Sequence, residues 1–135
     1  MKFIDTHAHI YLEEFDGDVP QVVQNAKEVG IERIYLPNID AGTIESMFRL
    51  ENDYPGFFYP MMGLHPTSVK EDYMDQLETI KKWLNERSFP AIGEIGIDLY
   101  WDDTYKKEQE KAFELQLNWA KEKGLPVVIH SRESF

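Results

Sequence analysis

Cysteine is absent from this 135-residue sequence, and so are long apolar runs and an excess of positive charge. Without cysteine there is no disulfide, no thiolate metal site and no cysteine nucleophile, which suits the reducing cytoplasm. The longest apolar run, 57–64, contains Pro60 and Gly63 and is too short to cross a bilayer. The N-terminus reaches Asp5 and His7 before the apolar core of a signal peptide can form, so we expect a cytoplasmic protein.

Charge and missing motifs argue against further classes of protein. There are 25 Asp and Glu residues against 14 Lys and Arg, a formal net charge of −11 at pH 7, so no broad basic surface for nucleic acid is expected. No glycine-rich dinucleotide motif or P-loop follows a strand candidate, and there is no G-x-S-x-G nucleophile elbow. We therefore expect neither a dinucleotide enzyme nor a P-loop NTPase.

The sequence does contain a regular alternation of strand-like apolar segments and amphipathic helix-like segments. Its length and its 42% hydrophobic content fit one compact folded domain, or part of a larger one, over residues 1–135. We predict an α/β protein with four helices between five short strands. The predicted strands are 3–7, 33–37, 57–64, 90–95 and 126–130. Parallel strands joined in this way form an open doubly wound sheet or a barrel, and both place their chemistry at the carboxyl ends of the strands.

Capping residues and glycines suggest where the four helices begin and end. Asp18 precedes the first helix, and Asp40 lies near the start of the second. The third is predicted to begin with a capping box over 68–71. The fourth is predicted to be capped by Thr104 and to end at Gly124. Their apolar stripes are expected to be core contacts.

Polar side chains stand at the ends of three predicted strands. His7 and His9 form an H-x-H pair, and because residues two apart in an extended segment face the same side, both imidazoles can reach one metal ion. Glu94 lies between glycines near the end of the fourth strand, where burying a carboxylate requires a cation or donors, and its two oxygens can bridge two metals. His130 ends the fifth strand. Together these residues predict a shared metal site.

Four further polar residues lie near the same strand ends. Asp5 can orient one of the histidines or can hydrogen-bond only to backbone. His65 can serve as an outer donor, a substrate contact or a proton shuttle, or can hold the loop that begins at Pro66. Asp98 can orient a ligand or cap a loop, and Arg132 can hold a phosphate oxygen through its planar guanidinium. For each residue, a functional and a structural role stay open.

Four motifs make the sequence similar to the TatD family of metal-dependent deoxyribonucleases, within the amidohydrolase superfamily. In chain order they are His7-x-His9, Gly63-Leu64-His65-Pro66, Gly93-Glu94-Ile95-Gly96-Ile97-Asp98 and His130-Ser131-Arg132. The resemblance implies a TIM (β/α)8 barrel of the metallo-dependent hydrolase type, of which this chain would hold about the first five strands and four helices. It also implies two divalent metal ions, Mg²⁺, Mn²⁺ or Zn²⁺, and hydrolysis of phosphodiester bonds in DNA.

The resemblance also implies roles for individual residues. The metal ligands would be His7, His9, Glu94 and His130, with Glu94 bridging the two metals. Candidate catalytic residues are Glu94 and His65, and candidate substrate-binding residues are Asp98 and Arg132. Family members continue to a sixth-strand His and an eighth-strand Asp, which this sequence does not contain. We therefore expect metal binding here, and DNA hydrolysis only when the remaining strands are present.

Two alternatives have different consequences. A superfamily relative that hydrolyses a small amide, lactone or phosphoester fits the acidic charge better than a DNA enzyme does. The second alternative is a non-catalytic, self-associating metal-binding module. Because five strands alone leave edge backbone and an apolar face open, we expect the missing C-terminal half of the barrel or a second copy to cover them. With a net charge of −11, metals rather than lysines must attract a phosphate.

Overall fold

The computed structural model describes all 135 residues, and its strands and helices alternate in the predicted β-α order. Short 3-10 turns lie in the first three loops that lead from a strand to a helix. The elements are β1 (Phe3–Asp5), η1 (Glu13–Phe15), α1 (Val19–Glu28), β2 (Ile31–Leu36), η2 (Ala41–Thr43), α2 (Ile44–Asp53), β3 (Phe58–Pro60), η3 (Pro66–Ser68), α3 (Tyr73–Glu86), β4 (Ile92–Asp98), α4 (Lys106–Lys123) and β5 (Val127–Arg132). None of the four α-helices combines the length and the apolarity that a membrane span requires.

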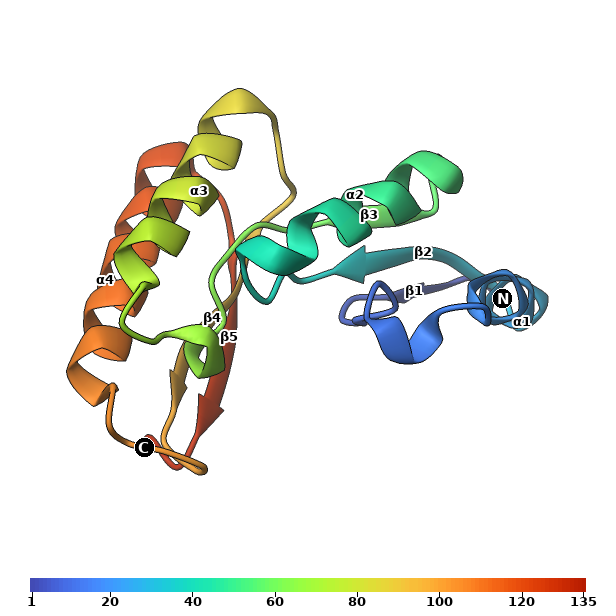
Figure 1. Ribbon diagram of the computed structural model, residues 1–135. Helices are drawn as coiled ribbons and strands as arrows, with labels where there is room; N and C mark the ends of the chain where they lie inside the picture. The colour runs from blue at the N-terminus through green and yellow to red at the C-terminus, as the bar shows by residue number, and fades with distance from the viewer.

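The five strands form one continuous, curved wall. All pairings are parallel, β1–β2–β3 in one sheet and β4–β5 in the other. The two sheets join where Met62 bridges Ile92 and the Gly93 N–H donates to the Met62 carbonyl at 3.0 Å. Figure 1 shows the wall turning between β3 and β4, with α3 and α4 side by side on one face of β4 and β5. The arrangement is a segment of a barrel rather than a doubly wound sheet, which would carry helices on both faces.

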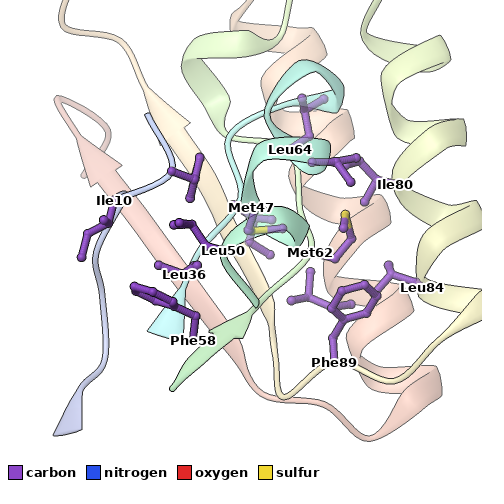
Figure 2. Packing of buried hydrophobic residues seen from close by; sticks show 14 of the residues in the cluster. Ile10, Leu36, Met47, Leu50, Phe58, Met62, Leu64, Ile80, Leu84 and Phe89 are labelled. Atoms are coloured by element: carbon purple, nitrogen blue, oxygen red, sulfur yellow. The ribbon is translucent and has the colours of Figure 1, made fainter. Parts of the chain in front are cut away.

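The main core lies between this wall and its helices. Leu36, Met47 and Met62 are fully buried. Figure 2 shows Met47 and Leu50 of α2 near Leu36, and Ile80 of α3 on the same side as Met62. This packing uses the apolar spacing that predicted both helices, so the helices have the core role expected from their sequence.

The predicted start of α3 is wrong. The capping box over 68–71 does not form, because Pro66 begins a 3-10 turn that includes Ser68. The Ser68 hydroxyl donates to a carboxylate oxygen of Asp40 at 3.3 Å, and α3 begins at Tyr73. Asp40 itself accepts from the Thr43 N–H, so it caps the short turn before α2. A contact between distant loops has replaced the local cap.

The predicted cap of α4 is also wrong. Its first residue is Lys106, and the Thr104 hydroxyl and N–H both donate to Asp102. Such a local turn competes with helix capping for the same side chain. The predicted end of α4 is correct, because Gly124 adopts the left-handed conformation with φ +64°.

The outer strands of the wall are its least buried strands. Phe3 and Ile4 of β1 are 49% and 52% exposed, and Ile129 of β5 is 55% exposed. Each outer strand pairs on one side only, whereas β4 is almost completely buried. The wall therefore has two open edges with apolar side chains.

Candidate metal centre

Glu94 lies at the centre of four histidines. Its side chain is only 7% exposed, and its two oxygens face different imidazoles. Oε2 lies 3.1 Å from Nε2 of His7 and 3.2 Å from Nε2 of His9. Oε1 lies 3.2 Å from Nδ1 of His130 and 3.7 Å from Nε2 of His65. The structure thus brings together the His and Glu residues predicted at strand ends and adds His65 to them.

Close backbone contact between β4 and β5 brings His130 to Glu94. Gly96 pairs with His130 in the sheet and has φ +146°. A Cβ atom on Gly96 would lie 1.9 Å from the His130 carbonyl oxygen, and a Cβ on Gly93 would lie 2.8 Å from Cβ of Val128. The two glycines on either side of Glu94 are therefore required by the close approach of the strands.

His7 and His9 lie just after β1 rather than within it. Strand β1 ends at Asp5, two residues before the predicted end of the first strand. A carboxylate oxygen of Asp5 accepts from the His7 N–H at 3.0 Å. Of the two roles open to Asp5, the structure shows the backbone role. The segment that carries both histidines is held against β2 by the Ala8 N–H, which donates to the Tyr35 carbonyl at 3.1 Å.

Tyr11 fixes the protonation of His9. The Tyr11 hydroxyl donates its single proton to the Pro37 carbonyl, so Nδ1 of His9, 2.9 Å away, must be the donor to Tyr11. The neutral His9 ring then has a lone pair on Nε2, facing Glu94. Burial, followed by the negative charge of Glu94, raises the pKa of Tyr11, which therefore stays a neutral hydroxyl.

His130 lies between two carboxylates. Nε2 is 2.7 Å from Oδ2 of Asp98 and Nδ1 is 3.2 Å from Oε1 of Glu94. A neutral imidazole has one N–H, and the shorter contact assigns it to Asp98, which leaves a lone pair on Nδ1 facing Glu94. At His9 and at His130 alike, a lone pair therefore faces a carboxylate oxygen. A cation between the two acceptors, or protonation of the ring, satisfies both.

His65 has the opposite tautomer. Its Nδ1 accepts from the Thr67 N–H at 3.2 Å, so the neutral ring carries its proton on Nε2, which faces Glu94. The backbone N–H of His65 donates to the Ile39 carbonyl at 2.7 Å. His65 therefore holds its loop, and its Nε2 faces the cluster; a role for His65 toward a substrate or in proton transfer stays a prediction.

Both carboxylates of the cluster are ionised. Burial acts to raise the pKa of Glu94, but the hydrogen bond from His65, the contact with His9 and the charge that His65 and His7 carry when protonated outweigh it and hold that pKa well below its usual range. Asp98 behaves similarly: burial is outweighed by the Tyr100 N–H, His130 and Arg132, so its pKa is lowered. Two ionised, nearly enclosed carboxylates are a suitable environment for divalent cations.

Arg132 is paired with Asp98. Its Nε and Nη2 atoms each lie 3.1 Å from Oδ2 of Asp98, whose side chain is 1% exposed. The Tyr100 N–H donates to the other Asp98 oxygen at 3.0 Å. Asp98 therefore contacts His130 and holds the loop after β4, and its role toward a ligand or substrate stays a prediction.

Two buried glutamines of α4 hold the backbone of the site, and the sequence reasoning missed both. The Leu64 N–H donates to Oε1 of Gln116 at 2.7 Å, and Nε2 of Gln116 donates to the Leu64 carbonyl at 3.3 Å. Gln109 makes the same pair of bonds with Asp98, at 2.9 and 3.0 Å. Each side-chain amide makes, with one backbone N–H and one backbone carbonyl at a strand end, the hydrogen bonds that a neighbouring strand would make. The available signal was two glutamines, seven residues apart, on the buried face of the helix that contains Ala112.

Asn38 was missed as well. It is fully buried, and its amide donates to the Gly63 carbonyl at 2.9 Å. Its backbone accepts from the Glu94 N–H and donates to the Gly93 carbonyl. Asn38 thereby joins the end of β2 to β4 directly beside the central carboxylate.

A curved parallel wall with histidines and carboxylates at the carboxyl ends of its strands defines a segment of a TIM-type barrel with a candidate metal centre. The arrangement agrees with comparisons to known proteins. The family model "TatD related DNase" matches residues 4–135, so the chain belongs to the TatD family. The family and the barrel fold predicted from the sequence are thereby confirmed.

Individual relatives support this assignment. The uncharacterized metal-dependent hydrolase YabD of Bacillus subtilis is 35% identical over 130 residues, which are 96% of this chain and 51% of the relative. The 3'-5' ssDNA/RNA exonuclease TatD of Edwardsiella piscicida is 31% identical over 121 residues, covering 90% of this chain and 46% of that protein. The chain thus spans about half the length of the curated relatives it matches.

Solved structures share the fold. The crystal structure of YjjV, a TatD homologue from Escherichia coli, matches 97% of this chain and 51% of its own, with a TM-score of 0.88 and 34% identity. A TatD family hydrolase from Entamoeba histolytica matches with a TM-score of 0.77 and 23% identity, a likeness of fold alone. The chain is therefore a segment of a TIM-like barrel, equal to about half of these proteins.

Proposed function

We propose that this chain contributes most of a two-metal site that hydrolyses phosphodiester bonds in DNA. The observation that supports the proposal best is the position of Glu94, whose two oxygens face separate imidazoles. One group of candidate ligand atoms comes from His7, His9 and Glu94, and a second group comes from His65, Glu94 and His130. Mg²⁺, Mn²⁺ and Zn²⁺ all suit such donors.

The residues have distinct roles in this proposal. His7, His9 and Glu94 would hold one ion, and Glu94 and His130 the other. Two bound divalent ions would activate a water molecule and neutralise charge on the phosphate. Glu94 stays ionised between them, as its lowered pKa requires.

Three further residues would act on the substrate or on the metal ligands. His65, with its proton on Nε2, would move a proton at the edge of the cluster, and its Nδ1 stays bound to the Thr67 N–H. Asp98 would hold His130 in the tautomer that leaves Nδ1 free. Arg132 would offer its remaining N–H groups to a phosphate oxygen, since Asp98 occupies only Nε and Nη2.

Hydrolysis would also require cover for the two open edges. Ile4 of β1 and Ile129 of β5 are exposed, and the relatives are about twice as long as this chain. We propose that further strands, from the C-terminal half of a barrel or from a second copy, cover these edges in the active protein. The chain by itself would bind metal without efficient hydrolysis. Light scattering of the purified chain measures whether it self-associates, and a monomer with uncovered edges argues against the second copy.

The central test combines metal binding with hydrolysis. Calorimetric titration with Mn²⁺ should give two sites per chain, and Glu94→Gln should lose both. Glu110→Gln, on the exposed side of α4, is the matched control and should keep both. A labelled single-stranded DNA should be cut only in the presence of divalent metal and most efficiently by a form with covered edges. Full metal binding by Glu94→Gln would contradict the proposal.

The acidic surface supports a second candidate, hydrolysis of a small amide, lactone or phosphoester. A net charge of −11 repels a DNA backbone but not a neutral ester. The same metal-loaded protein assayed on DNA and on a panel of small esters separates the two candidates. Metal binding with no activity on either substrate class, even with covered edges, would instead favour the non-catalytic module.

A further inference from the structure

We propose that Tyr100 and Trp101, in the loop between β4 and α4, form a stacking platform for one unpaired nucleobase beside the metal cluster. The inference rests on the proposed function and adds the residues that would recognise a base. It is supported by the exposure of the two rings, by the way they are held, and by the cavity next to them.

The two aromatic rings are unusually exposed for large apolar side chains. Trp101 is 77% exposed and Tyr100 is 54% exposed, whereas Trp119 is only 8% exposed. The two rings pack edge to face with centroids 4.7 Å apart. An indole face left open to water loses the benefit of burial, but it is available to a flat ligand.

Arg132 holds this pair next to the cluster. Its guanidinium carbon lies 4.6 Å from the Tyr100 ring centroid and 5.8 Å from that of Trp101. The same guanidinium is paired with Asp98, which in turn contacts His130. The platform is therefore connected to His130, a candidate metal ligand, through the ion-paired side chains of Arg132 and Asp98. A surface held in place in this way loses little entropy when a ligand binds.

The adjoining cavity favours a base over a phosphate. It has a volume of about 210 Å³ and is lined by Trp101, Tyr105, Asp98 and Asp102 among others. Asp98 is already paired with Arg132, and the exposed carboxylate of Asp102 repels a phosphate, whereas a neutral base can stack on aromatic walls. Lys70 also lines the cavity, with Nζ 5.4 Å from the Tyr105 ring centroid, and offers a positive charge to the sugar-phosphate chain outside.

The platform would select unpaired nucleotides. Every base inside a duplex already stacks on both faces, so using the platform there requires the base to be unstacked at a cost of a few kcal/mol. A base at a single-stranded end has a free face. The proposed contact therefore distinguishes a single strand from a duplex without reading its sequence, because every base presents a π face.

Binding of a base can be separated from binding of a phosphate. The probes are a fluorescein-labelled octamer of thymidylate and an abasic octamer with the same number of phosphates, measured by anisotropy at low salt with Ca²⁺ present. The full chain should bind the thymidylate octamer about tenfold more tightly than the abasic one. Trp101→Ala should reduce this ratio to near one, and Trp101→Phe should retain most of it. Met74→Ala, an exposed apolar residue of α3, is the matched control and should leave the ratio unchanged.

The contrary results are equally clear. Equal affinity of the wild-type chain for the two octamers, no binding of either, or an unchanged ratio in Trp101→Ala would each overturn the platform. None of these results bears on metal stoichiometry or its loss in Glu94→Gln, which test the proposed function. Conversely, a tenfold base preference that disappears in Trp101→Ala supports the platform even if the chain cuts no DNA.

Discussion

The Tyr11 hydroxyl lies 2.9 Å from Nδ1 of His9 and determines which nitrogen of that imidazole faces Glu94. Because the hydroxyl donates to the Pro37 carbonyl, it can only accept from His9. Nε2 of His9 is therefore the nitrogen available to a metal. A residue two positions beyond the H-x-H pair thus leaves Nε2 of one of its histidines without a proton, as the proposed metal site requires.

Tyr11→Phe should weaken metal binding without unfolding the protein. Loss of the hydroxyl removes the acceptor that keeps the proton on Nδ1, and partners of this kind typically change metal affinity by about 10- to 100-fold. Calorimetric titration with Zn²⁺ measures the change. Tyr59→Phe, whose hydroxyl contacts only the Gly56 carbonyl, is the control and should bind as the wild type does. Equal affinities for all three proteins would show that Tyr11 does not position His9.

Gln116→Leu should destabilise the fold by about 2–3 kcal/mol, because it leaves the buried N–H and carbonyl of Leu64 without their partner. Urea unfolding followed by circular dichroism measures this difference. Gln21→Leu removes an exposed side-chain bond to Asn25 and should change stability by less than about 0.5 kcal/mol. Similar midpoints for the two variants would contradict a positioning role for Gln116.

Gly96→Ala should be much more destabilising than Gly17→Ala. Both glycines have positive φ, but only at Gly96 would the new Cβ meet backbone, 1.9 Å from the His130 carbonyl oxygen. We expect a loss of at least about 3 kcal/mol at Gly96, against about 1 kcal/mol at Gly17, where no atom lies within 4 Å. Thermal unfolding of both variants tests this, and equal losses would mean that β4 and β5 can separate to admit a methyl group.

Acid should remove the stabilisation that Asp98 supplies. Its pKa in the folded protein lies below the ordinary value of 3.8, so its contribution is complete above about pH 4 and is lost as the pH falls through the lowered pKa. Asp98→Asn should be less stable than the wild type at pH 6, and the difference should shrink toward pH 2. Urea midpoints across this range measure it. A constant difference would indicate that the lost interaction does not depend on the carboxylate charge.

Local spacing was sufficient to predict the framework of the site. Apolar periodicity predicted the order of strands and helices, and the rule that parallel strands meet at their carboxyl ends brought His7, Glu94 and His130 together. Motifs that contain these residues predicted the TatD family, to which the chain belongs. The boundaries were less accurate, because caps such as Ser68 formed bonds with a distant loop instead of their own helix.

Partners far apart in the sequence decided the rest. Gln116 is 52 residues from Leu64, and Tyr11 is 26 residues from Pro37, so no local pattern could pair them. The sequence by itself determined which side chains stand at the strand ends, because that depends on periodicity along one chain. Only the tertiary structure decided the tautomers of His9, His65 and His130, because a ring nitrogen takes its role from the atom that packs against it.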